Sequence, residues 1–256
     1  MIYIVIPTYN EKDNILVLIK SIESLYAKNK NISILVADDN SPDGTKKIVN
    51  DYIKSEKNII PLLIVSKKTK TGLRDAYFNA FNFLIEKRKD ITGVIQMDAD
   101  LSHDPAYIKK HLDNLENGID LSIGSRYVSG GGINNWGLKR ILLSRLGKLM
   151  NEIVLSPKIK DYTGGFNGLS LKTIKFSTRP GVVSSSGYYF LTEMKYRILK
   201  SKKFRIVEFP IIFTDRVSGD SKMGKSIVFE SIKQLIRIRL GKIGINSTSQ
   251  EREILL

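Results

Sequence analysis

The 256-residue sequence lacks cysteine altogether and contains only two histidines. The first absence excludes disulfides, thiolate metal sites and a cysteine nucleophile. The chain also has no run of about 18 apolar residues, the length that a helix needs to span a bilayer. Its first residues show no signal-peptide pattern. We therefore expect a soluble chain without a leader or a transmembrane segment.

Acidic residues are scarce relative to basic ones, with 26 Asp and Glu against 41 Lys and Arg and a formal net charge of +15. A basic surplus suits nucleic acid, an anionic membrane surface or phosphorylated substrates as partners, and it equally suits a plain soluble surface. The composition, 42% hydrophobic and 26% charged, is typical of a folded protein. The positions of the charges must decide between these partners.

Short runs rich in β-branched residues alternate with amphipathic stretches along the first half of the chain. These patterns predict strands at 2–7, 32–39, 59–66 and 93–100 and helices at 11–27, 43–55 and 72–88. Strands that alternate with helices favour an α/β fold, a three-layer sandwich around a mostly parallel sheet with right-handed crossovers.

Beyond residue 118 the alternation is looser. The patterns there predict strands at 119–126, 166–171 and 205–213, a flexible glycine-rich loop at 127–136, and helices at 137–154, 188–200 and 225–240. We expect one domain over residues 1–240, followed by a loosely held tail at 241–256.

Polar clusters follow three of the expected strands: "TYNE" (8–11), "DDNSPDG" (38–44) and "DADLSHD" (98–104). Ligands of parallel α/β sheets bind beyond the carboxyl ends of the strands. Strand alternation places Asp98 and Asp100 on one side, where carboxylates suit Mg²⁺ or Mn²⁺ completed by water and substrate phosphates. Ser102 is a further candidate oxygen ligand. The expected ligand of this site is a diphosphate; the alternative is a solvated turn.

Several neighbouring residues have two interpretations. We interpret His103 as a hydrogen-bonding loop residue and Asp104, which precedes Pro105, as a helix cap. Glu11 either accepts from base N–H groups or simply begins a helix. Asp38 or Asp39 either accepts from ribose hydroxyls or belongs to a turn.

Six motifs in one order and spacing carry a family resemblance: "PTYNE", "DDNSPDGT", "GLRDAYFNAF", "DADLSHDP", "GSRYVSGG" and "EFPIIFTDRVSGDSKM". Over about residues 1–240 the chain resembles the inverting family 2 glycosyltransferases with a GT-A (Rossmann-like) fold, and among them the dolichyl-phosphate mannose synthases. The resemblance implies a catalytic domain over 1–240. It also implies transfer of mannose from GDP-mannose to dolichyl or another polyprenyl phosphate with inversion, giving a lipid-linked sugar donor for glycosylation.

The resemblance also implies roles for individual residues. Nucleotide-binding residues would be Pro7, Tyr9, Glu11, Asp39 and Asp98; metal-holding residues Asp98, Asp100 and Ser102; catalytic residues Asp100, Arg126, Arg216 and Lys222; and acceptor-phosphate residues Arg140 and Ser144. The chain departs from the family at "DYTGGFN" (161–167), where an Asp-x-Thr-Ser-Gly-Phe-Arg run is usual. Gly164 takes the serine position and Asn167 the arginine position, which puts the sugar identity in doubt.

The chemistry of the acceptor separates the remaining alternatives. A sugar hydroxyl would need a general base, for which Asp161 is the best candidate unless it only fixes its loop. A phosphate monoester has a second pKa of about 6, is largely a dianion at neutral pH, and needs cations instead. Alternatives are a UDP-glucose or UDP-GlcNAc donor, and a sugar-to-sugar transferase, although the Gln-x-x-Arg-Trp run of processive members is absent.

The expected location follows from the helices at 137–154 and 225–240, which mix apolar stripes with Lys and Arg as interfacial helices do. Each also fits a core-facing helix with a basic solvated face. We expect peripheral association with the cytoplasmic face of a membrane, with a small membrane protein as an additional partner. Nucleic-acid binding is the alternative from another class, but clustered carboxylates repel phosphate without a metal, so we expect no nucleic acid.

Overall fold

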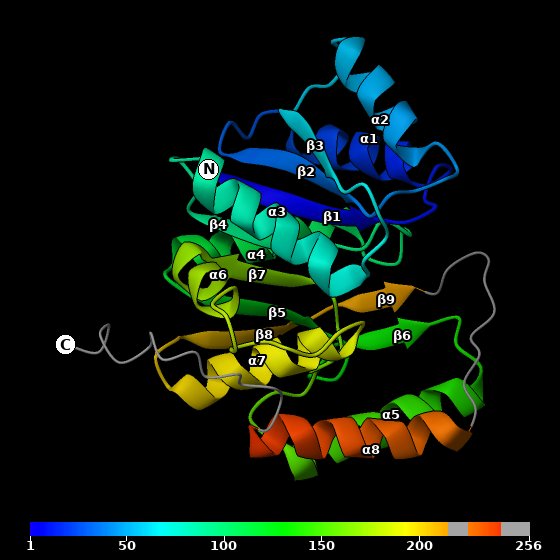
Figure 1. Ribbon diagram of the computed structural model, residues 1–256, viewed down its shortest axis with the longest axis vertical. Helices are drawn as coiled ribbons and strands as arrows, with labels where there is room; N and C mark the ends of the chain where they lie inside the picture. Colours follow the sequence, from blue (N-terminus) through cyan, green and yellow to red (C-terminus); the bar gives the residue numbers. More distant parts are fainter. Residues whose placement is uncertain (215–224, 242–256) are drawn as a thin grey trace.

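The computed structural model describes residues 1–214 and 225–241 (Figure 1). Its central layer is a seven-stranded sheet in the order β3-β2-β1-β4-β7-β5-β8. The strands are β1 (Ile2–Thr8), β2 (Ile32–Asp38), β3 (Leu62–Ser66), β4 (Gly93–Gln96), β5 (Leu121–Ser125), β7 (Asn167–Ser170) and β8 (Ile206–Pro210). All neighbours pair in parallel except β7, which runs antiparallel to both β4 and β5. The predicted, mostly parallel sheet is confirmed.

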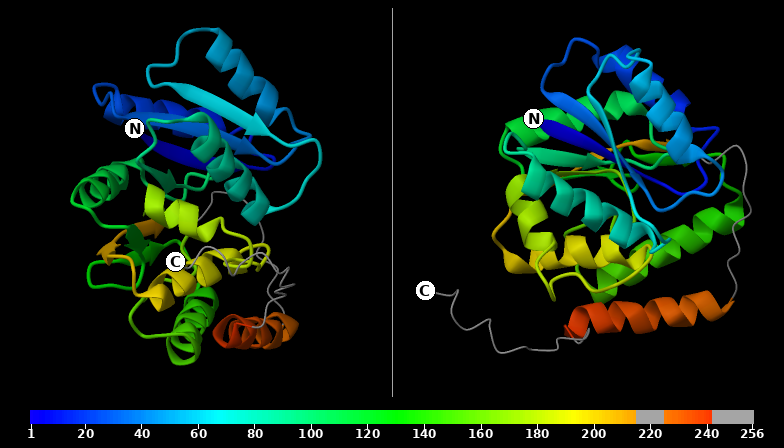
Figure 2. Two further views of the ribbon diagram at one scale, coloured as in Figure 1. Left: turned by 60° about the vertical axis from the view of Figure 1, so that its left-hand side comes forward. Right: turned by 45° about the horizontal axis from the view of Figure 1, so that its top comes forward.

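Helices cover both faces of this sheet (Figure 2). One face carries α3 (Leu73–Lys87), α6 (Leu171–Ser177) and α7 (Tyr189–Ser201), and the other carries α1 (Ile15–Tyr26), α2 (Thr45–Lys54) and α4 (Ile108–Glu116). Strand alternation in β1 sends Tyr3 and Val5 into the first core and Ile4 and Ile6 into the second. The predicted three-layer sandwich is therefore confirmed.

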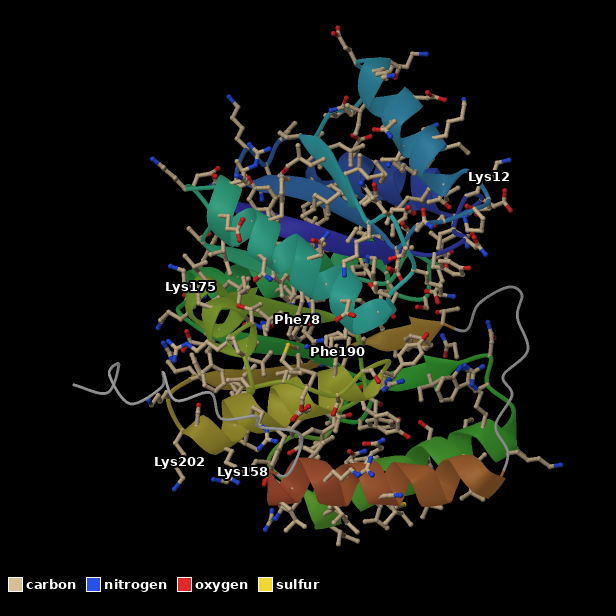
Figure 3. The ribbon with its side chains drawn as sticks, viewed as in Figure 1. Lys12, Phe78, Lys158, Lys175, Phe190 and Lys202 are labelled. Atoms are coloured by element: carbon tan, nitrogen blue, oxygen red, sulfur yellow. The ribbon has the colours of Figure 1, made fainter. Side chains whose placement is uncertain are left out.

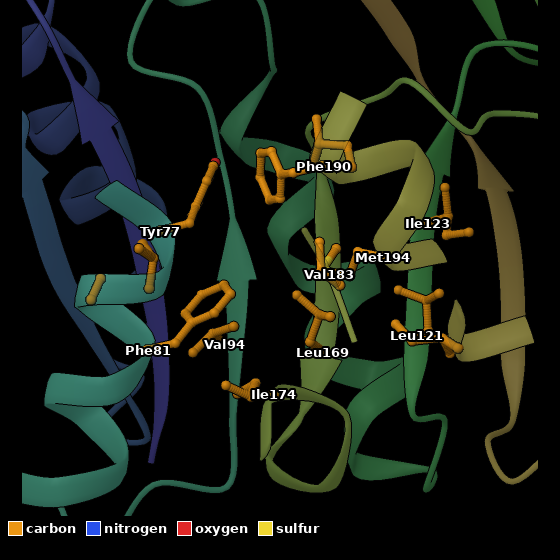
Figure 4. Close-up of a cluster of buried hydrophobic side chains, with 14 of the residues drawn as sticks. Tyr77, Phe81, Val94, Leu121, Ile123, Leu169, Ile174, Val183, Phe190 and Met194 are labelled. Carbon is orange, nitrogen blue, oxygen red and sulfur yellow. The ribbon is translucent and has the colours of Figure 1, made fainter. Parts of the chain in front are cut away.

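Aromatic side chains fill the first core between α3 and α7. Figure 4 shows Tyr77 and Phe81 of α3 beside Val94 of β4, with Phe190 of α7 across from them. The ring centres of Tyr77 and Phe190 lie 5.6 Å apart. In Figure 3 the lysines at the surface, such as Lys202, point away from the body of the molecule. The fold thus separates its apolar interior from its basic exterior in the usual way.

The remaining elements of the described chain are two helices, a two-stranded sheet and a short 3₁₀ turn. Helices α5 (Leu138–Val154) and α8 (Lys225–Leu240) lie side by side beyond α7 (Figure 1), and β6 (Gly132–Asn134) pairs in parallel with β9 (Ile212–Thr214). A short 3₁₀ turn, η1 (Pro105–Tyr107), precedes α4. Within residues 1–214 and 225–241, no helix is long and apolar enough to cross a membrane.

The predicted strand at 93–100 is wrong in its second half, because β4 ends at Gln96. The backbone N–H of Asp98 donates to His103 Nδ1 at 3.2 Å, and Leu101 adopts a left-handed conformation with φ of 63°. The chain therefore turns away from the sheet at the first aspartate. Asp98 and Asp100 belong to a loop, and strand alternation does not determine which way they point.

Several other boundaries also differ from the predictions. The helix predicted at 11–27 runs only over Ile15–Tyr26, so Glu11 precedes it. The strand predicted at 59–66 starts only at Leu62. The strand predicted at 205–213 is two strands, β8 and β9, because its partner changes: Ile211 N donates to Ser125 O of β5 at 3.1 Å, whereas Ile211 O accepts from Gly132 N of β6 at 3.0 Å. The glycine-rich loop predicted at 127–136 contains β6. Because β6 pairs with β9, residues 127–136 lie next to the carboxyl ends of the strands.

Candidate functional site

The predicted polar loops meet at the carboxyl ends of β1, β2 and β4. Thr8 Oγ1 donates to Asp38 Oδ1 at 3.0 Å, and Asp39 N donates to Thr8 O at 3.0 Å. The hydroxyl of Thr45, at the start of α2, accepts from Glu11 N at 3.0 Å. These bonds lock the loops after the first two strands to one another, so the edge of the sheet has a fixed polar surface.

Asp39 is a buried carboxylate that holds the segment leading into α3. Its oxygens accept from Thr71 N at 2.8 Å and from Gly72 N at 2.7 Å. Each oxygen therefore has a backbone donor before any ligand is considered. Asp39 thus connects the loop after β3 to the end of β2. A ribose bound here would contact a surface that is already held in place by these hydrogen bonds.

The other predicted nucleotide-binding residues lie on the same edge. Pro7 is buried within β1, whereas Tyr9 is 39% exposed. Lys70 Nζ lies 3.4 Å from the centre of the Tyr9 ring, which is cation–π distance. Glu11 Oε2 accepts from Asn14 Nδ2 at 2.8 Å. Sequence reasoning did not predict Lys70 as a site residue. The available signal was the lysine-rich segment at 67–70, directly after β3.

Asp98 and Asp100 lie in the loop after β4. Ser102 donates to Asp100 Oδ1 through its N–H at 3.1 Å and its hydroxyl at 2.5 Å. The hydroxyl proton of Ser102 is thus engaged in a hydrogen bond to Asp100. A Cβ added to Gly165 would lie 3.1 Å from each carboxylate oxygen of Asp98, so the 161–165 turn packs directly against that carboxylate.

The donor set of this loop fits a hard divalent cation. Its carboxylate and hydroxyl oxygens are the ligands that Mg²⁺ and Mn²⁺ prefer. Within the described residues, no group of three or more His, Cys, Asp or Glu could hold a metal without help. A cation between Asp98 and Asp100 would therefore depend on oxygens from water or from a bound phosphate, the arrangement common for Mg²⁺.

His103 and Asp104 have the structural roles that were predicted for them. The His103 ring is buried, stacks on Phe166 with centres 4.9 Å apart, and accepts from Asp98 N. Burial lowers the pKa of His103, although the nearby carboxylates of Asp98 and Asp100 oppose that shift. Asp104 accepts from Ala106 N at 2.8 Å and caps η1. Both residues shape the loop that carries the two aspartates.

Arg126 and Asp161 form a buried ion pair. Arg126 Nε and Nη2 donate to the two oxygens of Asp161, each at 2.8 Å, and Arg126 N and Gly164 N donate to the same carboxylate. Burial by itself would raise the pKa of Asp161, but the Arg126 guanidinium holds it well below its usual range. Asp161 therefore fixes the turn that contains Gly164 and holds Arg126, as its alternative interpretation predicted.

An aromatic bridge connects Arg126 with Arg140. The Arg126 guanidinium lies 5.5 Å from the ring centre of Phe213, whose ring contacts Trp136 edge-on with centres 5.9 Å apart. The Arg140 guanidinium lies 4.0 Å from the ring centre of Trp136. Sequence reasoning missed both aromatic residues, because Phe213 and Trp136 meet only through the pairing of β6 with β9.

Ser144, the second predicted acceptor residue, faces the same region. Its hydroxyl hydrogen-bonds the hydroxyl of Tyr127, the residue that follows Arg126. Arg216 and Lys222, the two predicted mobile-loop cations, lie outside the described residues. Strand β9 ends at Thr214, whose N–H donates to Ser102 O at 3.2 Å. The structure thus connects Arg140 with Arg126 through Trp136 and Phe213, connects Ser144 with the residue after Arg126, and ends β9 beside the aspartate loop.

Comparison with known proteins identifies relatives over nearly the whole chain. Residues 3–175 match the family described as glycosyl transferase family 2. The chain is 32% identical to the polyprenol monophosphomannose synthase of Mycolicibacterium smegmatis, covering 90% of this chain and 83% of that one. It is 33% identical to the undecaprenyl-phosphate mannosyltransferase of Micrococcus luteus, covering 91% of each. The dolichol-phosphate mannosyltransferase of Pyrococcus furiosus is 33% identical over 92% of this chain, which spans 62% of that protein.

A solved structure shows the same fold. The glucosyl-3-phosphoglycerate synthase of Mycobacterium tuberculosis, in complex with Mn²⁺, UDP-glucose and phosphoglyceric acid, superimposes with a TM-score of 0.64. The alignment covers 96% of this chain and 81% of that one at 17% identity. At this identity the likeness concerns the fold, which is the predicted GT-A arrangement.

Proposed function

The chain belongs to glycosyl transferase family 2, and we propose that it transfers mannose from GDP-mannose to dolichyl phosphate or another polyprenyl phosphate, with inversion. The names of three relatives that each cover at least 90% of this chain support mannosyl transfer to a polyprenyl phosphate. GDP as the nucleotide of the donor is our inference from the sequence motifs.

The single observation that carries the acceptor class is the state of Asp161. A hydroxyl acceptor must lose a proton as it attacks, which requires a base with a pKa near the working pH. Asp161, the candidate base, is fully buried, and both of its oxygens are engaged by Arg126. A phosphate monoester needs no base, since its second pKa is about 6. Its requirement is for cations, and Arg140, the predicted acceptor-phosphate residue, supplies one at the far end of the aromatic bridge.

The donor would lie along the edge formed by the loops after β1, β2 and β4. Pro7, Tyr9, Glu11 and Asp39 would hold its nucleoside, while Asp98 and Asp100, with Ser102 behind them, would hold Mg²⁺ or Mn²⁺. The cation would supply charge stabilisation for the departing diphosphate. Arg126, together with Arg216 and Lys222, would contact the donor phosphates, and Arg140 and Ser144 would receive the phosphate of the lipid.

A lipid acceptor also gives a role to the outer face of α5. Leu138 is 86% exposed, Leu142 70% and Ile153 73%, and basic residues of the same helix surround them. Contiguous exposed apolar side chains mark interaction surfaces, and their mixture with Lys and Arg suits an anionic membrane surface. We propose that the protein binds the cytoplasmic face of a membrane peripherally, with a small membrane protein as an additional partner.

Transfer assays with three donors test this function. The protein is incubated with Mn²⁺, dolichyl phosphate in vesicles and, separately, radiolabelled GDP-mannose, UDP-glucose or UDP-GlcNAc, and the lipid is then extracted. We expect label in the lipid from GDP-mannose alone, and none after EDTA treatment. Label from a UDP-sugar would correct the donor, a point raised by Gly164 and Asn167. Absence of label with every donor would refute transfer to a lipid phosphate.

A further inference from the structure

Lys195 of α7 is fully buried beneath the 161–165 turn. Its ammonium donates to Asp161 O and to Gly164 O, each at 2.8 Å. Taking an ammonium out of water costs several kcal/mol unless polar partners compensate. An apolar side chain at this position of α7 would avoid that cost. Packing alone therefore does not explain why a lysine is present here.

The turn that Lys195 holds connects two parts of the proposed active site. On one side, Gly164 N donates to Asp161, the partner of Arg126. On the other side, the turn packs against the carboxylate of Asp98 at Gly165. A shift of the two carbonyls bound by Lys195 would therefore move the support of Arg126 and of Asp98 together.

Charge balance gives Lys195 a second effect. Apart from Asp98, two carboxylates border the turn: Asp161, and Glu208 of β8, which accepts from Asp161 N at 2.9 Å. Arg126 alone would leave Asp161 and Glu208 with one surplus negative charge, next to the place proposed for phosphates. Lys195 brings the summed charge of these four residues to zero. His111 of α4 is close enough to Lys195 to interact with it electrostatically. His111 stays neutral, because burial lowers its pKa to about 3.

Asn167 contacts the same carbonyl. Its Nδ2 donates to Gly164 O at 3.1 Å, and it stands where the family resemblance implies an arginine. A cation from α7 therefore reaches this turn in a chain that lacks the arginine at 167. We propose that Lys195 is a positioning residue for glycosyl transfer, fixing the 161–165 turn and balancing its carboxylates so that Arg126 and Asp98 can hold a nucleoside diphosphate. The identity of that ligand rests on the proposed function.

Calorimetric binding of GDP at saturating Mg²⁺ tests the role without turnover. We expect Lys195→Met to bind GDP about tenfold more weakly than wild type, roughly the effect of losing one charge-assisted contact of 1.4 kcal/mol. Lys203→Met, which removes an exposed lysine just beyond α7, should bind as wild type does. A Lys195→Met protein that is less stable to heat yet binds GDP normally well below its melting temperature would show a merely structural lysine and overturn the proposal.

Proton uptake provides a test on the unmodified protein, whether or not Lys195→Met folds. Burial lowers the pKa of Lys195 to about 8, although Asp161 and Glu208 oppose that shift. An anionic diphosphate bound nearby would raise this pKa, so GDP binding at about pH 8.5 should take up protons, and at about pH 6.5 almost none. Buffers of different ionisation enthalpy measure this uptake. Equal uptake at both pH values would contradict the proposal.

The two hypotheses fail separately. If the wild-type protein labels the lipid and Lys195→Met binds GDP normally, only the role of Lys195 is refuted. Weakened GDP binding by Lys195→Met, together with no lipid labelling by wild type, would support the role of Lys195 and refute mannosyl transfer.

Discussion

The edge of the sheet and the outer face of α5 differ in the exposure of their functional side chains. At the sheet edge, Asp39 and Asp161 are buried, and their oxygens accept from backbone and side-chain donors that are already in place. On α5, Leu142 and Ile153 are 70% and 73% exposed. The donor side is therefore organised within the protein before any ligand binds. The acceptor side that we propose exposes apolar surface on α5, which suits a lipid-linked acceptor.

The largest expected effect concerns the donor side. Asp100→Asn should lower transfer by about 10³-fold, since it removes a charge that would hold the metal against the leaving diphosphate. Its melting temperature should stay close to that of wild type. Asp104→Asn is the matched control, because Asp104 caps η1 and asparagine caps equally well. Full activity of Asp100→Asn would rule out the metal assignment.

The ion pair behind the site should be the next most sensitive feature. Arg126→Met leaves Asp161 buried without its main partner and should cost about 3–5 kcal/mol of unfolding free energy, measured by urea denaturation. Adding Asp161→Asn removes the unpaired charge and should restore much of that stability. Transfer should remain low in both variants. If the double variant also regained transfer, Arg126 would not contact the donor phosphates.

The apolar face of α5 should affect binding without affecting folding. Leu142→Gln combined with Ile153→Gln should weaken sedimentation with anionic vesicles by about 10²-fold, roughly tenfold for each side chain that no longer enters the membrane. The unfolding free energy should change by less than about 0.5 kcal/mol for each exposed site. Val17→Gln in α1 with Ile59→Gln in the loop before β3, both also exposed, is the control. Equal vesicle binding by both pairs would leave α5 without a membrane role.

The smallest expected effect is a difference in acid sensitivity. The folded pKa of Asp161 lies below its unfolded value of about 3.9. The carboxylate therefore contributes stability that is fully present above that value and is lost as the pH falls toward its folded pKa. A variant with both Arg126→Met and Asp161→Asn should lose stability less steeply than wild type below about pH 4. Parallel acid-unfolding curves would show that this pair does not titrate as described.

Sequence reasoning predicted what depends on local pattern. Alternating strands and helices predicted the three layers, and the polar loops after β1, β2 and β4 predicted the site. The end of β4 was missed because a side chain, His103, takes the N–H that a continuing strand would have used. The contact of Phe213 with Trp136 depends on strand pairing. Lys195 contacts the 161–165 turn from the helix predicted at 188–200, in which no site residue was predicted.

The nature of the acceptor decides the central claim most directly. The wild-type protein is given labelled GDP-mannose, Mn²⁺ and vesicles that contain either a polyprenyl phosphate or the matching polyprenol, which has a hydroxyl in place of the phosphate. We predict label in the polyprenyl phosphate and none in the polyprenol, because the site offers cations and Arg126 occupies both oxygens of its buried aspartate, Asp161. Equal labelling of the polyprenol would contradict this account.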